Sequence, residues 1–160
     1  MSVQKRKILS SSKSGFTLVE VLVTAGVVVV VLTGLMQLFI YCRALADMAA
    51  NTAFAVTEAQ DKMEEIRNTS YDLITTNYVS GGTPGNIFSL GAHGAVGSIY
   101  IDSSNSDLLR VDVSVGWRNI NGRVIGEDLD LDGDIDAGED VNGNSKLDSP
   151  VMLSTSIARK

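Results

Sequence analysis

The stretch Gly15–Cys42, GFTLVEVLVTAGVVVVVLTGLMQLFIYC, sets the architecture of the chain. It is apolar almost throughout, and from Val21 onward it carries no charged residue. A helix of this length crosses the ~30 Å hydrocarbon core of a bilayer at about 1.5 Å per residue. A core helix of a soluble protein would need a polar face, whereas this segment offers only Thr24, Thr33 and Gln37. We therefore expect a membrane-spanning helix.

The position of the cleavage signal is more specific than the hydropathy. A secretory signal peptide places its small-residue cleavage site after the apolar region, whereas here Gly15 precedes that region. The motif KSGFTLVEVLV, Lys13 to Val23, resembles the class III signal of type IV prepilins and pseudopilins. The resemblance implies that prepilin peptidase, an aspartyl peptidase of the inner membrane, cleaves after Gly15 and methylates the new amino terminus at Phe16. The spanning helix would then stay on the mature protein.

Glu20 is the acid inside this motif, at the edge of the predicted hydrocarbon segment. An ionised side chain at that depth is costly unless it is paired, so we expect a functional partner. After cleavage the Phe16 ammonium would lie about one helical turn away, and an acid in the first turn also suits the helix dipole. The resemblance implies a role in filament assembly, in which this acid pairs with the amino terminus of a neighbouring subunit. The alternative is an acid that only caps the helix in the headgroup region.

The leader, residues 1–15, contains four cations and no acid. Positive residues beside a spanning helix stay in the cytoplasm, so we expect a single-pass protein of the bacterial inner membrane with a periplasmic head, which later enters a filament. Loss of the leader lowers the formal net charge from −6 to about −10, which disfavours binding to nucleic-acid phosphates. The expected partners are the inner membrane, prepilin peptidase and other pilin or pseudopilin subunits, contacted through the N-terminal helix.

The helix should continue beyond Cys42 with a different character. Small and apolar residues recur at steps of four and three from Leu45 to Ile66, which places them in one stripe. The expected organisation begins with a leader at residues 1–15, a transmembrane or filament-core helix at 16–42 and an amphipathic helix at 43–69. A β-rich periplasmic head follows at 70–160, with an acidic insertion at 127–149.

Short alternating segments after the helix predict β-strands. The clearest is Leu109–Trp117, whose odd-numbered residues are all apolar. Further strands are predicted at Ile87–Leu90, Val96–Ile101 and Val151–Ala158, with a turn at Asp102–Asp107. The fold class is α+β: a long N-terminal helix, transmembrane in its first half and amphipathic in its second, packed on a small antiparallel sheet, as in the pilin lollipop. The one histidine, His93, is expected in a loop.

The acidic segment 127–148 contains nine of the chain's 19 acids. It is either a solvated disordered loop or a cation site. Asp128, Asp130, Asp132, Gly133 and Glu139 match the calcium-loop pattern D-x-D-x-D-G-x5-E, and Asp134 and Asp136 lie within its variable stretch. In this register alternate aspartates surround a hard cation, Asp134 contributes its backbone carbonyl, and Glu139 closes the site with two oxygens. We expect a structural Ca2+ there, with Ile135 pointing to the core.

A second, weaker loop starts at Asp140, with Ser145 in place of the glycine and Val151 in place of the closing acid. Neither loop has the flanking helices of an EF-hand, so the segment resembles helix-poor calcium loops such as those of dockerins. The chain has one cysteine and hence no internal disulfide. Resemblance to the major pseudopilins of type II secretion, which calcium stabilises in a similar region, implies that the ion replaces the disulfide.

No catalytic constellation is visible, because the histidine is isolated and no glycine-rich phosphate loop follows a strand. We therefore predict a structural protein rather than an enzyme. Ala53–Arg67, Tyr71 and Trp117 resemble the corresponding parts of pilus-modification minor pilins and I-type minor pseudopilins. The expected function is a minor pilin or minor pseudopilin of a type IV pilus or type II secretion filament. The alternatives are a major subunit and a filament-displayed, calcium-dependent adhesin or binding module.

Overall fold

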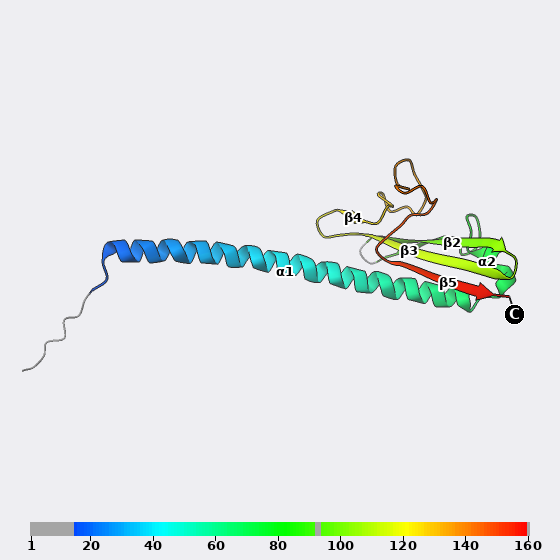
Figure 1. Ribbon diagram of the computed structural model, residues 1–160, viewed down its shortest axis with the longest axis horizontal. Coiled ribbons are helices and arrows are strands. Elements are labelled where there is room, and N and C mark those ends of the chain that lie inside the picture. The colour runs from blue at the N-terminus through cyan, green and yellow to red at the C-terminus, as the bar shows by residue number, and fades with distance from the viewer. Residues whose placement is uncertain (1–14, 92–93, 160) are drawn as a thin grey trace, which may run out of the picture. The chain divides into compact units, whose positions relative to one another are not determined.

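The computed structural model describes residues 15–91 and 94–159. The chain forms two compact units that divide after Cys42. The elements are α1 (Leu18–Arg67), α2 (Tyr71–Asn77), β1 (Ile87–Leu90), β2 (Ala95–Asn105), β3 (Leu108–Arg118), β4 (Val124–Ile125) and β5 (Met152–Ala158) (Figure 1). This confirms the α+β class, with a long N-terminal helix followed by a small antiparallel sheet. Most of the leader and His93 lie outside the described residues.

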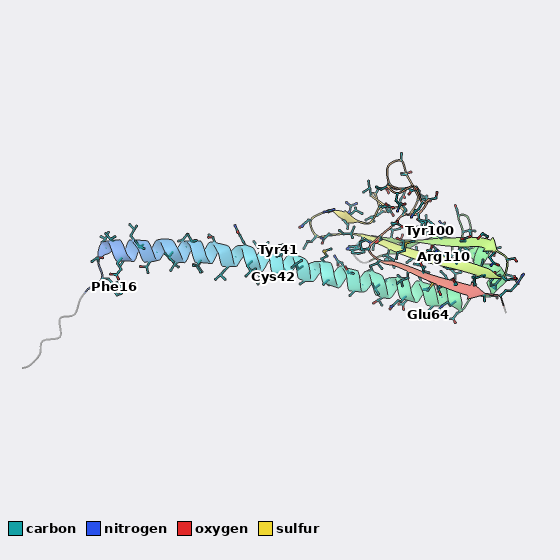
Figure 2. All side chains as sticks on the ribbon, in the orientation of Figure 1. Phe16, Tyr41, Cys42, Glu64, Tyr100 and Arg110 are labelled. Atoms are coloured by element: carbon teal, nitrogen blue, oxygen red, sulfur yellow. The ribbon has the colours of Figure 1, made fainter. Side chains whose placement is uncertain are left out.

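The first unit is helical from Leu18, and its side chains project from all sides of the helix (Figure 2). Every described residue up to Cys42 is exposed, and α1 is long and apolar enough to cross a membrane. Its threonines need no solvent, because Thr24 Oγ1 donates to the Glu20 carbonyl and Thr33 Oγ1 donates to the Val29 carbonyl at 3.0 Å. Such internal satisfaction is what a hydrocarbon environment demands of polar groups.

In the second unit, the later turns of α1 pack on a five-stranded sheet with the order β1-β2-β3-β4, in which β5 also pairs with β3. The central strand places Val113 opposite Ile99 of β2 and Leu153 of β5. The core joins the helix to the sheet through buried residues that include Ala55, Ala59, Met63, Ile66, Ile74, Ile99, Leu109, Val111, Val113, Val115, Trp117 and Val151. The expected stripe is buried only from Ala59, and Leu45 is 50% exposed.

Two local features differ from the expectations. Strand β2 continues through the expected turn to Asn105, because a register shift after Asp102 keeps it paired with β3. Helix α2 has no apolar period, since its seven residues YDLITTN are mostly polar. Its Ile74 is nonetheless fully buried, so tertiary packing rather than local pattern defines this element.

Both faces of β3 are buried. Its odd-numbered residues pack against α1, as the alternation predicts. On the other face Asp112 and Ser114 are only 1% and 3% exposed. The acidic insertion covers that face, since Ser114 Oγ donates to the Leu147 carbonyl at 2.6 Å. The insertion is therefore a folded layer on the sheet rather than a detached loop.

Candidate functional site

The predicted cleavage junction lies just before α1. Gly15 and Phe16 are non-helical and exposed. Thr17 then starts the helix, because its Oγ1 and its carbonyl accept from the Glu20 N–H at 3.3 and 3.1 Å. The pair Thr17-x-x-Glu20 has the spacing of a capping box, a local signal that the sequence reasoning above missed.

The Glu20 carboxylate has no hydrogen-bond or ion-pair partner among residues 15–91 and 94–159. The Gln37 amide, further along the same apolar helix, likewise has none within that part of the chain. A carboxylate at the membrane boundary without a partner is unfavourable. Any group that pairs with Glu20 must therefore lie outside the described chain.

The loop 128–139 is closed by two buried carboxylates. Asp128 is 4% exposed, and its oxygens accept from the N–H groups of Leu131 and Gly133 at 2.7 and 3.0 Å. Glu139 is also 4% exposed, and its oxygens accept from the N–H groups of Leu129 and Asp136 at 2.7 and 3.0 Å. These bonds bring the first and the last acid of the loop together.

Five of the six carboxylates converge in two overlapping groups. Oxygens of Asp128, Asp130 and Glu139 lie within 4.8 Å of one another, and so do oxygens of Asp130, Asp132 and Asp136. Two oxygens bound to one Ca2+ at 2.3–2.6 Å cannot be more than about 5 Å apart, so both groups meet this condition. The side chain of Asp134 belongs to neither group.

The carboxylates of this loop are destabilised in their charged form. Burial raises the pKa of Asp128, and repulsion by Asp132 raises the pKa of Asp136. No Lys or Arg in the described part of the chain forms an ion pair with a carboxylate of the loop 128–139. The negative charge is therefore balanced only by backbone N–H groups, which is costly for buried carboxylates.

The expectation for Ile135 was wrong. Its side chain is 43% exposed instead of pointing to the core. The loop 128–139 contacts the sheet through its central turn, where Ser98 Oγ donates to the Gly133 carbonyl at 3.1 Å. Ile135 follows two residues later and lies beyond this contact, so nothing buries it.

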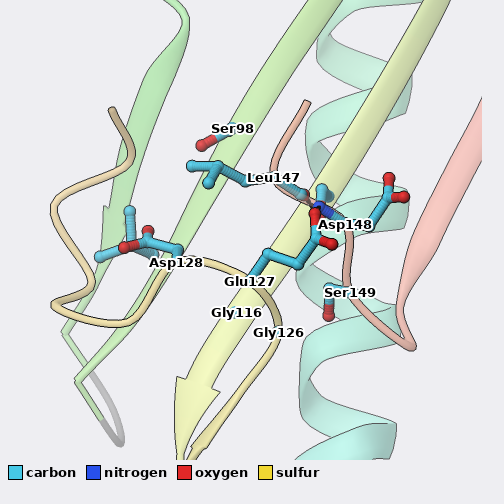
Figure 3. A pocket seen from close by; sticks show the side chains of 10 residues that line it. Ser98, Gly116, Gly126, Glu127, Asp128, Leu147, Asp148 and Ser149 are labelled. Carbon is cyan, nitrogen blue, oxygen red and sulfur yellow. Dashed lines mark hydrogen bonds between the residues drawn. The ribbon is translucent and has the colours of Figure 1, made fainter. Parts of the chain in front are cut away.

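A small cavity of about 10 Å³ lies between the insertion and the sheet (Figure 3). It is lined on the sheet side by Ser98 and Ser114, and on the insertion side by Glu127, Asp128 and Asp148. Its size suits at most one water molecule. The cavity is thus a packing gap between two polar layers and is too small for an organic ligand.

The comparisons with known proteins bear on the N-terminal segment. The family model described as the prokaryotic N-terminal methylation motif matches residues 10–36. No curated protein and no solved structure matches the chain. The match confirms the resemblance seen in the sequence and supports a type IV pilin-like protein anchored by its apolar helix. It implies processing by prepilin peptidase and assembly with other pilins, and it points to a structural role.

Proposed function

Because residues 10–36 carry the N-terminal methylation motif, we propose that the chain is a minor pilin or minor pseudopilin, a structural subunit of a type IV pilus or a type II secretion pseudopilus. The observation that carries this proposal is the place of the motif, at the start of a helix that exposes apolar side chains on every side. Such a surface is stable in a bilayer or against other apolar helices. Removal of the leader would remove the cations that hold this end at the cytoplasmic surface.

In this proposal Glu20 pairs with the methylated ammonium of Phe16 on a neighbouring subunit. The absence of any partner for Glu20 in the described chain supports an intermolecular contact. A charged acid near the bilayer centre costs about 2.5–3.5 kcal/mol, and a boundary position costs less. Pairing would recover that cost only in the assembled filament, so Glu20 favours assembly.

The test compares Glu20→Gln with Asp61→Asn, an exposed acid on the same helix that forms no ion pair in the described chain. Both full-length variants are expressed in the native host. Mass spectrometry of the amino terminus measures processing, and the sheared filament fraction measures assembly. We expect both variants to begin with N-methylphenylalanine. Only Glu20→Gln should assemble poorly, by at least about tenfold, which corresponds to 1.4 kcal/mol.

Two results would oppose the proposal. Mature protein that begins at Met1, or after an alanine-type cleavage site, would show that the methylation motif is not used. Normal assembly of Glu20→Gln would remove the assembly role of this acid, even if processing is normal.

We further propose that the loop 128–139, named the calcium loop from here on, binds a structural Ca2+. Support comes from the twelve-residue pattern, from the two groups of converging oxygens, and from the buried Asp128 and Glu139, which form no ion pair in the described part of the chain. A cation would offset the repulsion among these acids and would order a segment that is otherwise too long for an unstructured connection. The ion has no catalytic part in this proposal.

Thermal unfolding of the full-length protein in detergent tests the cation. At a free Ca2+ concentration of about 100 times Kd, binding adds about 2.7 kcal/mol to the free energy of unfolding. For a unit of this size that corresponds to a rise in Tm of roughly 10 °C over the chelated protein. Asp130→Asn, in both carboxylate groups, should abolish most of the rise, whereas Asp134→Asn, in neither, should retain it. Equal Tm values with Ca2+ and with chelator would contradict the calcium site.

A further inference from the structure

The acidic insertion is an internal duplication with a period of twelve residues. Residues 126–136, GEDLDLDGDID, align with residues 138–148, GEDVNGNSKLD. The backbone repeats as well, with left-handed φ angles at three equivalent pairs: Gly126 and Gly138, Leu131 and Gly143, and Gly133 and Ser145. Asp140 accepts from the N–H groups four and five residues later at 3.0 and 2.9 Å, as Asp128 does at 3.2 and 3.0 Å.

Each loop is closed by the glutamate of one copy of the repeated Gly-Glu-Asp sequence. Glu139 donates its N–H to the Asp136 carbonyl at 3.2 Å and accepts the Asp136 N–H at 3.0 Å. Its counterpart Glu127 donates its N–H to the Asp148 carbonyl at 2.8 Å and accepts the Asp148 N–H at 2.9 Å. The second loop, residues 140–148, is thus closed by an acid that precedes the calcium loop. The two loops form one unit, so a contact that holds one of them also holds the other.

The loops differ in what they offer to the sheet. At equivalent positions the calcium loop has Asp134 and Ile135, whereas the second loop has Lys146 and Leu147. Leu147 is 3% exposed, against 43% for Ile135. Its N–H donates to the Tyr100 hydroxyl at 2.7 Å, and its carbonyl accepts from Ser114 as described above. Leu147 therefore attaches the second loop to β2 and β3, whereas the first loop contacts the sheet through Gly133.

An ion pair adds to this contact. Lys146 Nζ lies 2.5 Å from Asp112 Oδ2, and the Asp112 side chain is only 2% exposed. The other oxygen of Asp112 accepts from Arg110 Nε at 3.2 Å, but the Arg110 side chain is 59% exposed. Lys146 is the only lysine of an otherwise acidic insertion, and it meets the buried acid of the sheet. The charges of the two layers are complementary at this one point.

We propose that Lys146 is a positioning residue, whose ion pair with Asp112 holds both loops on the sheet and couples cation binding in the calcium loop to the stability of the second unit. The coupling rests on the calcium part of the proposed function, whereas the anchoring needs no ion. Without Lys146 the buried Asp112 carboxylate keeps the Ser154 hydroxyl and the solvent-exposed Arg110, and the insertion loses its charged attachment. Cation binding would then stabilise the strands mainly through the contact of Gly133 with Ser98, so most of the coupling would be lost.

The test uses the full-length protein in detergent with Lys146→Met, the conservative Lys146→Arg, and Arg110→Met as the matched control. Hydrogen exchange of the peptide that contains Leu147, measured in chelator, reports the anchoring. The rise in Tm on adding Ca2+ reports the coupling. For Lys146→Met we expect at least tenfold faster exchange and less than half of the wild-type rise. Lys146→Arg and Arg110→Met should keep both properties.

The rise in Tm separates positioning from a general loss of stability. A merely structural role would lower Tm equally with and without Ca2+ and would leave the rise unchanged. Unchanged exchange at Leu147 in Lys146→Met, or an unchanged rise in Tm, would overturn the proposal. If the wild type shows no rise at all, the calcium site and the coupling both fail, and the exchange measurement still decides the anchoring. None of these results depends on filament assembly, which tests the proposed subunit role separately.

Discussion

Replacing Gly133 with alanine should destabilise the second unit, because two constraints meet at this residue. Its φ is +86°, in the left-handed region, and a Cβ there would lie 2.6 Å from Ile87 Cγ2. The backbone strain costs about 1–2 kcal/mol for an L-residue. A contact roughly 1 Å shorter than the normal carbon–carbon separation also forces Ile87 to move, which costs about 1–3 kcal/mol more. The expected total loss of unfolding free energy is therefore about 2–5 kcal/mol.

Gly143→Ala is the matched control, because Gly143 has φ +72° and a Cβ added there would meet nothing within 4 Å. It should show only the strain. Circular-dichroism melts of the full-length protein in chelator should place Gly133→Ala below Gly143→Ala by roughly 4–12 °C, at about 4 °C per kcal/mol. In an Ile87→Ala background, Gly133→Ala should cost only the strain, because the overlapping side chain is absent. Equal melting temperatures for the two glycine variants would refute the close contact between the calcium loop and β1.

Three further changes test the core and the charges. Ile66→Ala should cost about 2–5 kcal/mol in urea denaturation because Ile66 is fully buried, whereas Leu45→Ala, at a half-exposed site, should cost no more than about 0.5 kcal/mol. Trp117→Phe should lower the free energy of unfolding by less than about 1.5 kcal/mol, because it removes a buried Nε1 donor that has no acceptor in the described chain. A larger loss of stability would mean that the native indole is hydrogen-bonded. Repulsion by Asp132 raises the pKa of Asp136 above its usual 3.8, so without Ca2+ the folded state binds a proton on Asp136 more tightly than the unfolded state does. The free energy of unfolding therefore falls as pH rises through that pKa. Asp136→Asn should flatten this part of the Tm–pH curve, and an unchanged curve would contradict the repulsion.

The elements with local signals follow from the amino-acid sequence alone. The long apolar segment predicts the part of α1 that lies in the first unit. The alternation from Leu109 to Trp117 predicts β3 and its buried face. The periods of helices and strands depend only on neighbouring residues, so no long-range information is needed to read them. The methylation motif is local in the same way, since it lies within residues 10–36.

The sequence does not predict, in contrast, which segment covers the other face of the sheet. Asp112 alternates with apolar residues as it would on a solvated strand, yet it is buried by a loop 34 residues further along the chain. Ile135 and Leu147 occupy the same position of the twelve-residue repeat, yet one is exposed and the other is buried. Burial depends on which surface lies within contact distance, and that follows from how the chain packs rather than from the pattern of either loop.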